Sequence, residues 1–255
     1  MKVLIACECS QTACEEFRAL GHEAYSCDIE PCYGGHPEWH ILGDCLGIIE
    51  GGVTFETEDG ISHSIEGAWD MIIAHPPCTY LSNAATRSHS LKGSTLEQIN
   101  SRTEKRIKAQ EFFMRFANVN CKKVAIENPI GVMSTVYRKP DQIIDPYQFA
   151  DSVNDAENYV TKRTCLWLKG IKPLKTNDLP RPDNARIYGR WSNGKAGCWH
   201  EVQKGKNKAT VRSKTFPGMA KAMAEQWGQK GGTNGYTKRY SDKQKTISEY
   251  QKDGS

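Results

Sequence analysis

The sequence has no long apolar run and no signal peptide at its start. Among its 255 residues, no apolar run approaches the roughly 20 residues that a helix needs to cross a bilayer. The first residues, Lys2-Val3-Leu4-Ile5-Ala6, are typical of a buried strand rather than of a secretory leader. We therefore predict a cytosolic protein without a membrane partner.

Paired cysteine motifs are also missing, although cysteine itself is plentiful. The chain has 10 cysteines but no Cys-x-x-Cys spacing of the kind that indicates a zinc site. Thiols of a cytosolic protein stay reduced, so we expect most of these cysteines to be buried as small apolar side chains, and we assign no metal. A zinc site remains an alternative for a group near the N-terminus, formed by Cys7, Cys9, Cys27, Cys32, His36, His40 and Cys45.

The chain lacks a strong charge of either sign. Its net charge is +4, and positive charges gather toward the C-terminal end, where Glu201 is the one acid between Lys195 and Lys214. The basic residues of that stretch are Lys195, Lys204, Lys206, Lys208, Arg212 and Lys214. A polyanion would be attracted to them, because neutralising phosphates releases counterions. A solvated basic surface explains the same pattern equally well.

What the sequence does contain is a series of short apolar runs that alternate with amphipathic helical patterns. This alternation predicts an α/β fold with a mostly parallel twisted sheet and helices on both faces. Strands are expected at residues 2–6, 23–27, 71–74, 123–126 and 159–168, with a further short one near 43–44. Helices are expected at 10–20, with Ser10 as N-cap, at 95–117, with Leu96 and Ile107 on its apolar side, and at 216–227.

The same patterns divide the chain into one main domain and smaller parts. Residues 1–169 and 213–228 carry the strands and helices of the main domain, and 46–68 predict a hairpin inserted in it. Residues 170–212 are rich in Pro, Gly and Lys and form a small insert. Residues 229–255 are polar and predict a disordered tail. We expect a monomer.

Two of the predicted strands are followed by reactive side chains. The strand at 71–74 leads through Pro76 and Pro77 to Cys78, and the strand at 123–126 leads to Glu127. Prolines stiffen the first loop, and the carboxyl ends of parallel strands share the edge where open α/β sheets place ligands. A thiolate beside a carboxylic acid suits addition to an electron-poor ring, with the acid protonating a ring nitrogen. An inert Cys78 and a helix-capping Glu127 remain the alternative.

The order of these motifs resembles that of the DNA cytosine-5 methyltransferases, in particular their small phage versions. Pro76-Pro77-Cys78 followed by Ser82 is similar to the family's nucleophile loop, and Glu127-Asn128-Pro129 to its Glu-Asn-Val motif. The stretches 162–167 and 212–218 are similar to its basic strand and to its final motif. The resemblance implies a Rossmann-like S-adenosylmethionine-dependent methyltransferase fold, with the main domain as catalytic domain and residues 170–212 as target-recognition region.

The resemblance also implies a reaction and its residues. Cys78 would attack carbon 6 of a cytosine in DNA, Glu127 would protonate or hydrogen-bond ring nitrogen 3, and carbon 5 would take a methyl group from S-adenosylmethionine. Arg163 would hold the target nucleotide, which must leave the duplex to be reached. The other residues implied to contact nucleic acid are Ser82, Asn128, Lys162, Lys206 and Arg212.

Cofactor residues are implied at the ends of the first strands. The loop after the first strand stands where the family has a glycine-rich turn, yet residues 7–12 contain no glycine. Asp28 is expected to bind ribose hydroxyls and Asp44 the adenine amino group, although an ordinary loop acid is the alternative for each. The residues implied for the cofactor are Cys7, Glu8, Ser10, Asp28, Asp44 and Pro76.

Two other functions stay open. An enzyme that methylates N4 of cytosine or N6 of adenine needs no cysteine, but it leaves Glu127 unexplained. A non-catalytic DNA-binding relic of the fold would account for the missing glycines. In the insert, Tyr188, Trp191 and Trp199 lie among basic residues and either stack on bases or fill a small core. The small size of the insert predicts short or relaxed sequence specificity.

Overall fold

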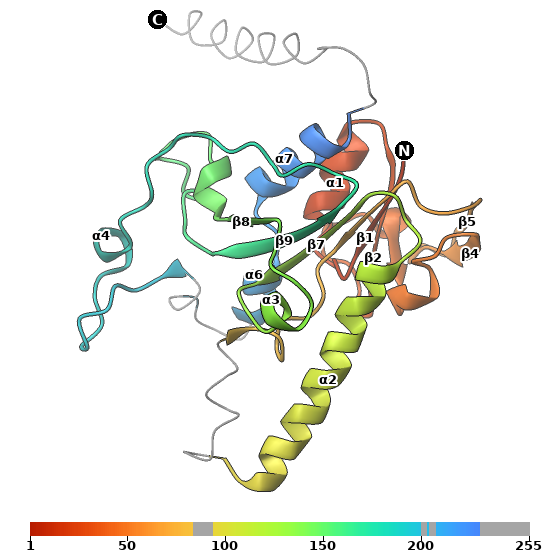
Figure 1. The fold of residues 1–255 in the computed structure, drawn as a ribbon. Coiled ribbons are helices and arrows are strands. Elements are labelled where there is room, and N and C mark those ends of the chain that lie inside the picture. The colour runs from red at the N-terminus through yellow and green to blue at the C-terminus, as the bar shows by residue number, and fades with distance from the viewer. Residues whose placement is uncertain (84–93, 200–202, 204–207, 230–255) are drawn as a thin grey trace, which may run out of the picture.

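A seven-stranded mixed sheet with the order β3-β2-β1-β6-β7-β9-β8 forms the centre of the protein (Figure 1). It is seen in a computed structural model, which describes residues 1–83, 94–199, 203 and 208–229. The strands of the sheet are β1 Lys2–Ala6, β2 Glu23–Asp28, β3 His40–Leu42, β6 Met71–Ala74, β7 Val124–Pro129, β8 Gln142–Ile144 and β9 Thr164–Lys169.

The direction of the strands identifies the functional edge of this sheet. Strands β3, β2, β1, β6 and β7 run parallel, whereas β9 is antiparallel to both of its neighbours, β7 and β8. The predicted α/β fold with a mostly parallel sheet is therefore confirmed. The strand order reverses between β1 and β6, and doubly wound sheets bind their ligands outside the carboxyl ends of the strands at such a point.

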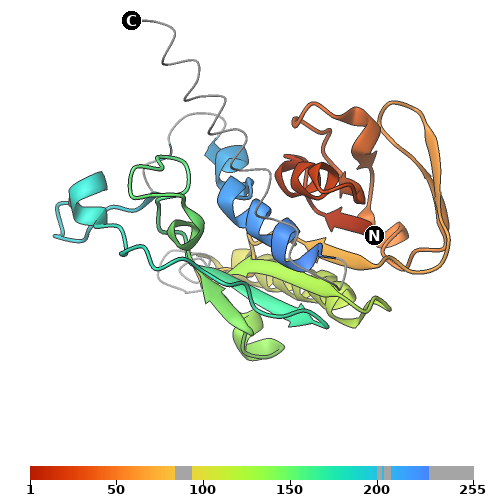
Figure 2. The ribbon, with the colours of Figure 1, turned by 90° about the horizontal axis from the view of Figure 1, so that it is seen from above.

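Helices cover both faces of the sheet (Figure 2). α1 (Thr12–Ala19) and α7 (Pro217–Trp227) pack together on one face, and α2 (Leu96–Asn118) lies on the other. The shorter helices are α3 Met133–Val136, α4 Asn184–Tyr188 and α6 Lys208–Ser213. None of the described helices is long and apolar enough to cross a membrane.

Side chains of the central strands point alternately to the two faces of the sheet and form a separate core on each face. In β1, Leu4 packs toward α2 together with Phe113 and Phe116, whereas Val3 and Ile5 pack toward α1 and α7. The strands β6 and β7 alternate in the same way, as expected from the two-residue period of a β-strand. Strands buried on both faces must be apolar throughout, and this explains the continuous apolar runs in the sequence.

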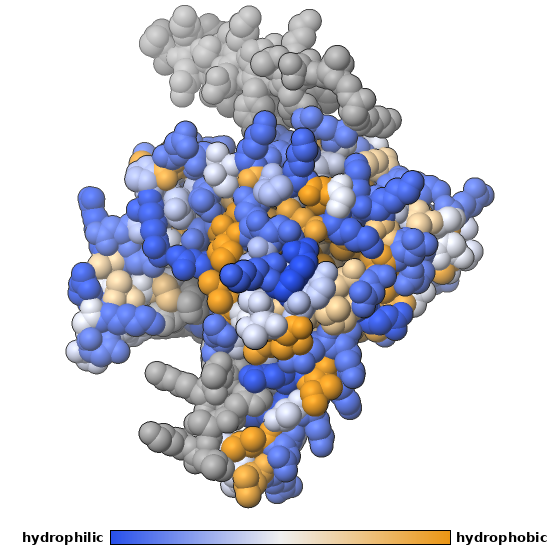
Figure 3. Space-filling model, in the orientation of Figure 1, coloured by the Kyte–Doolittle hydropathy of each residue, from blue (hydrophilic) through white to orange (hydrophobic). Residues whose placement is uncertain are grey.

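Helix α2 is only half covered by the sheet. It begins with a capping box at Thr95, close to the predicted start, and buries Phe113 and Phe116 in its C-terminal half. Its N-terminal half projects away from the sheet (Figure 1), and apolar side chains lie among polar ones along it (Figure 3). Leu96 and Ile107, predicted on or near the apolar side of this helix, are 68% and 49% exposed, so the apolar side is left uncovered there.

The predicted hairpin is confirmed as a small separate sheet. β4 (Val53–Glu56) and β5 (Ser62–Ile65) pair antiparallel, and Phe55 and Ile65 bury against Trp69 of the main core. The insertion thus extends the core on the α2 face instead of standing alone.

Three boundaries differ from the prediction around the last strands. β7 continues through Glu127 and Asn128 to Pro129, because β9 pairs with it along this length. β9 begins at Thr164, later than predicted, and β8 was not predicted at all. Most of the predicted disordered tail, residues 230–255, lies outside the described residues.

Candidate active site

Cys78 begins a tight turn directly beyond β6 at the carboxyl edge of the sheet. The backbone N–H groups of Leu81 and Ser82 both donate to its carbonyl, at 3.1 and 3.0 Å. From α2, Arg106 Nε donates to the carbonyl of Tyr80 at 3.2 Å. All ten cysteines of the chain are described and free, and Cys78 is the exposed one among them. The prediction that most cysteines are buried is wrong, because only five of the ten are buried: Cys14, Cys27, Cys45, Cys121 and Cys165.

The turn is fastened to the end of β7 by two contacts. The buried Asn128 donates from Nδ2 to the carbonyl of Pro76 at 2.6 Å. Ser82 forms a bridge with Gly131, where a Cβ would lie 2.0 Å from the carbonyl oxygen of Leu81. The first contact explains why an amide is suited to position 128, and the second why a glycine is needed at 131. Asn128 and Ser82, predicted to contact nucleic acid, therefore also shape the Cys78 turn.

Glu127 lies in β7 beside this turn and contacts His75. Its Oε2 atom is 3.3 Å from His75 Nδ1, and the two side chains are 20% and 9% exposed. Burial alone would raise the pKa of Glu127, but the hydrogen bond and charge of His75, together with Lys162 and Thr164, lower it. The lowered pKa favours a carboxylate at Glu127 in the free protein, in contact with His75 and under the influence of the Lys162 charge.

The thiol of Cys78 feels the same charges. Although the residue is exposed overall, desolvation of its thiol raises its pKa, and the negative charge of Glu127 raises it further. The ammonium group of Lys162 acts in the opposite direction. Cys78 and Glu127 are thus brought together as the sequence predicts, with Lys162 close enough to influence both.

Lys162 and Arg163 point to different surroundings. Lys162 Nζ donates to the backbone carbonyl of Arg212 at 2.7 Å and lies 5.8 Å from the ring centre of Trp199. Arg163 is 52% exposed, and its Nε is 4.0 Å from the carboxylate of Asp145. Of these two residues it is therefore Lys162, expected to bind nucleic acid, that acts on Cys78 and Glu127, whereas the predicted role of Arg163 at the base remains a prediction.

The first loop makes its turn without glycine by placing two other residues in the left-handed region. Cys7 has φ of 60° and Gln11 has φ of 61°, values that favour glycine. The buried carboxylate of Glu8 accepts the N–H groups of Ala13 and Cys14, at 2.8 and 3.2 Å. Glu8 therefore caps α1 in a manner that satisfies free N–H groups and complements the helix dipole.

This geometry corrects the prediction that Ser10 is the N-cap. The cap position is Gln11, whose side chain makes no cap hydrogen bond, and the helix begins at Thr12. Ser10 is buried and contacts Glu8 at 3.4 Å. Three of the residues predicted to bind cofactor are buried: Glu8, Ser10 and Pro76. In this structure they shape the loops at the edge of the sheet.

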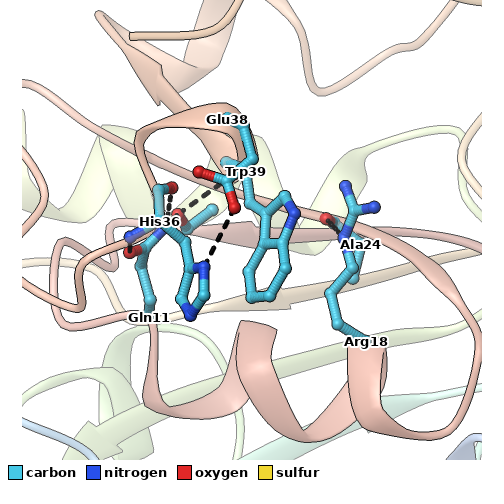
Figure 4. Close-up of polar contacts among 7 residues, drawn as sticks. Gln11, Arg18, Ala24, His36, Glu38 and Trp39 are labelled. Atoms are coloured by element: carbon cyan, nitrogen blue, oxygen red, sulfur yellow. Dashed lines mark hydrogen bonds and ion pairs between the residues drawn. The ribbon is translucent and has the colours of Figure 1, made fainter. Parts of the chain in front are cut away.

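Gln11 clamps the loop that follows β2 (Figure 4). Its Nε2 donates to the carbonyl of His36 at 2.7 Å, and its Oε1 accepts the N–H of His36 at 3.0 Å. The imidazole of His36 stacks on Trp39 at 3.7 Å, and the guanidinium of Arg18 lies 5.2 Å from the Trp39 ring. Arg18 is itself fixed by donating from Nε to the carbonyl of Ala24 at 2.6 Å. The loops after β1 and β2 therefore form one rigid wall of the edge.

Asp28 and Asp44 lie at the same edge with apolar side chains beside them. Both charges act on the thiol of Cys27, and the N–H of Gly43 donates to the carbonyl of Asp28 at 2.9 Å. Ile29 and Leu42, next to these acids in the chain, are 74% and 48% exposed. The edge thus offers carboxylates for hydroxyl or amino groups and apolar surface for a flat ring.

The aromatic residues of the insert lie in different surroundings. Trp199 packs against Phe216 with ring centres 5.0 Å apart, beside Lys162, so it belongs to the wall of the site. Trp191 is 46% exposed in a turn that links Arg190 and Ala196. Trp199 thus fills a small core, whereas Trp191 lies at the surface of the insert. Lys206, predicted to bind nucleic acid, lies outside the described residues.

His75 is the member of the site that the sequence analysis missed. A titratable side chain at the end of a buried strand, one residue before the two prolines, was the signal that could have revealed it. Cys7, in turn, is half-buried and its Sγ lies 3.8 Å from Sγ of Cys45. Within the described ranges, no three or more His, Cys, Asp or Glu side chains are grouped to hold a metal ion.

Comparison with known proteins does not assign the chain to a family. No family model matches the sequence, and no curated protein matches it significantly.

Proposed function

We propose that the protein is a DNA methyltransferase that transfers a methyl group from S-adenosylmethionine to carbon 5 of cytosine. One observation carries this proposal: Cys78, Glu127 and Lys162 interact electrostatically at the carboxyl edge, next to the point where the strand order reverses. A partly desolvated thiol near a half-buried carboxylate suits covalent addition to a ring that gains a proton.

The chain's own residues would act on the base in a defined order. The Cys78 thiol first gives its proton to solvent. Its sulfur then adds to carbon 6, and electrons of the ring move toward nitrogen 3, which takes up a proton delivered through Glu127. Carbon 5 is then electron-rich and accepts the methyl group. Loss of the carbon 5 proton and of the Cys78 sulfur restores the aromatic ring. Glu127, which lies beside the thiol, is placed to serve nitrogen 3 of a base held over both.

The residues at the ends of β2 and β3 fit S-adenosylmethionine. Asp28 would hold the ribose hydroxyls and Asp44 the adenine amino group, while the exposed Ile29 and Leu42 offer apolar surface to the purine. When bound, this cofactor supplies an electrophilic methyl group. The acids of this edge also suit its positive sulfonium charge.

DNA is proposed as the substrate because Lys162 acts on the thiol and further basic and aromatic residues lie on the insert. Lys162 and Trp199 form one wall of the site, and Arg190 and Arg186 extend a basic surface over the insert. A base could reach Cys78 only after leaving the duplex, since the reacting ring atoms are covered by stacking in double-stranded DNA.

Product analysis tests this function. The purified protein is incubated with DNA and S-adenosylmethionine labelled in its methyl group, and the DNA is digested to nucleosides and separated. We expect the label in 5-methylcytosine, and no label with C78A. Label in N4-methylcytosine or N6-methyladenine would replace the proposal by amino methylation. Binding of DNA without any label would favour a non-catalytic protein.

A further inference from the structure

His75 lies between two acids that come from different strands. It follows β6 directly, and its backbone N–H donates to the carbonyl of Ala6 in β1 at 2.9 Å. β6 pairs with β1 on one side and with β7 on the other, so the imidazole stands between Glu8 and Glu127. Its Nδ1 is 3.3 Å from Glu127 Oε2. Its Nε2 is buried and has no hydrogen-bond partner in the part of the chain that the structure describes.

The surroundings favour a protonated ring. Burial alone would lower the pKa of His75, and Lys162 lowers it as well, but the hydrogen bond and charge of Glu127 and the charge of Glu8 raise it above its ordinary value. A carboxylate can only accept hydrogen bonds, so Nδ1 carries a proton toward Glu127. The remaining titratable neighbour is the Cys78 thiol, which interacts with Glu127.

This arrangement answers a difficulty in the proposed reaction. Glu127 is expected to protonate ring nitrogen 3, yet in the free protein it is a carboxylate with no proton to give. The proton nearest to it is the one on Nδ1 of His75.

We propose that His75 is the proton reservoir of Glu127, so that the two residues form a relay behind the substrate base. After the Cys78 thiol has lost its proton to solvent, its sulfur bonds to carbon 6, and the proton on Nδ1 moves to Glu127 and from Glu127 to nitrogen 3. The pair is left as a neutral imidazole and a carboxylate until nitrogen 3 returns the proton. The inference rests on the proposed function, and His75 is a positioning residue because it acts through Glu127.

The first test separates the proton from the hydrogen bond. In H75N, the side-chain amide can still donate to Glu127 but cannot release a proton. We expect kcat to fall by about 100- to 10,000-fold with an unchanged KM for DNA, as for loss of a general acid. The basic limb of the pH profile should move to lower pH, because the variant then needs Glu127 itself to be protonated.

A matched control removes another half-buried histidine. H63Q changes His63 in the hairpin, which contacts Tyr25 and Thr57 at 3.1 Å each, and it should keep the wild-type pH profile. An H75N profile that keeps its wild-type shape, whatever its rate, would overturn the relay and leave His75 with an orienting role only.

The second test needs no substrate. The folded pKa of His75 lies above its unfolded value of 6.5, so its stabilising effect is fully present below pH 6.5 and is lost as pH rises through the folded pKa. Urea unfolding of the wild type should therefore show a loss of stability over this window that is smaller in H75N and in E127Q but retained in H63Q. The same pH slope in all four proteins would show that the ion pair does not exist, and the relay would fall with it.

The outcomes distinguish the relay from the proposed function. If the wild type forms 5-methylcytosine but H75N keeps its pH profile, only the relay is wrong. If the wild type forms no 5-methylcytosine, the proposed function fails and the relay fails with it, even when the pH slope of unfolding confirms the ion pair.

Discussion

A thiol reacts as a nucleophile only after it loses its proton, and the surroundings of Cys78 oppose this loss in the free protein. Desolvation and the charge of Glu127 raise its pKa, and Lys162 offsets part of the effect. A protein that must protect an exposed thiol until a base is present benefits from such a balance. The chemistry of the site is therefore set by three side chains acting on one another rather than by Cys78 alone.

The reactivity of Cys78 toward iodoacetamide tests this balance. Because the thiolate is the reacting species, K162M should slow alkylation by about 3- to 10-fold near neutral pH, and E127Q should accelerate it by a similar factor. R163M is the control, since Arg163 lies beside Asp145 and is not among the charges that act on Cys78 or Glu127. The rate is followed by mass spectrometry of the Cys78 peptide. Equal rates in all variants would contradict the electrostatic account.

At the residue scale, the sequence predicted the reactive pair but not its support. Cys78 and Glu127 could be placed at one edge because both follow apolar runs that had to be neighbouring parallel strands. The interaction of Glu127 with His75 depends on the pairing of β6 with β7, and no local pattern encodes this pairing. The choice between Lys162 and Arg163 depends on how the chain enters β9, which begins just after them, and the sequence pattern does not specify this.

At the scale of elements, the Cys78 turn is a rigid part of the sheet edge. It is bonded to β7 through Asn128, bridged to Gly131 and held by Arg106 from α2. Three attachments from two elements keep the thiol in place without help from the turn's own short sequence. Loss of one attachment should therefore affect both stability and catalysis.

The close approach at Gly131 provides a sharp test. In G131A, the new Cβ would lie 2.0 Å from the carbonyl oxygen of Leu81, so the turn must move. We expect a loss of about 1–3 kcal/mol in the free energy of unfolding, as for overpacked sites, together with a loss of methyl transfer. The control is G47A, because a Cβ at Gly47 meets nothing within 4 Å. Urea denaturation gives the free energy of unfolding of G131A and of G47A. Equal stability of G131A and wild type would contradict the close approach of Gly131 to Leu81.

Helices and strands with a long apolar pattern in their own sequence were predictable. Those that form only through pairing with another strand were missed. β1, β6 and α7 follow from their sequences, whereas β8 has three residues and exists through its pairing with β9. The predicted start of α1 was wrong because Glu8 caps the helix from outside it, across a turn with positive φ at Cys7 and Gln11. Helix propensity cannot reveal such a cap.

At the scale of the whole molecule, the two cores cannot separate. β1, β6 and β7 alternate their side chains between the α2 face and the face covered by α1 and α7. Because the same three strands contribute side chains to both cores, disruption of one core also displaces the strands that form the other core. The general alternation of strands and helices was enough to predict this architecture, but not the antiparallel β9, because period-two patterns do not specify strand direction.

This sharing predicts a single cooperative unfolding transition. Tryptophans report on both cores, since Trp69 and Trp167 lie on the α2 face and Trp227 lies on the other. Urea curves followed by tryptophan fluorescence and by far-UV circular dichroism should therefore coincide. Two separated transitions would show that one face unfolds independently of the other.

The central claim is that Cys78 forms a covalent bond to carbon 6 of cytosine during methyl transfer. The most direct measurement uses a duplex containing 5-fluorocytosine with S-adenosylmethionine, because fluorine at carbon 5 blocks the elimination that would release the enzyme. The account predicts a denaturant-stable protein–DNA adduct with the wild type and none with C78S. An adduct that persists in C78S, or its absence with folded wild-type protein on several DNA sequences, would contradict it.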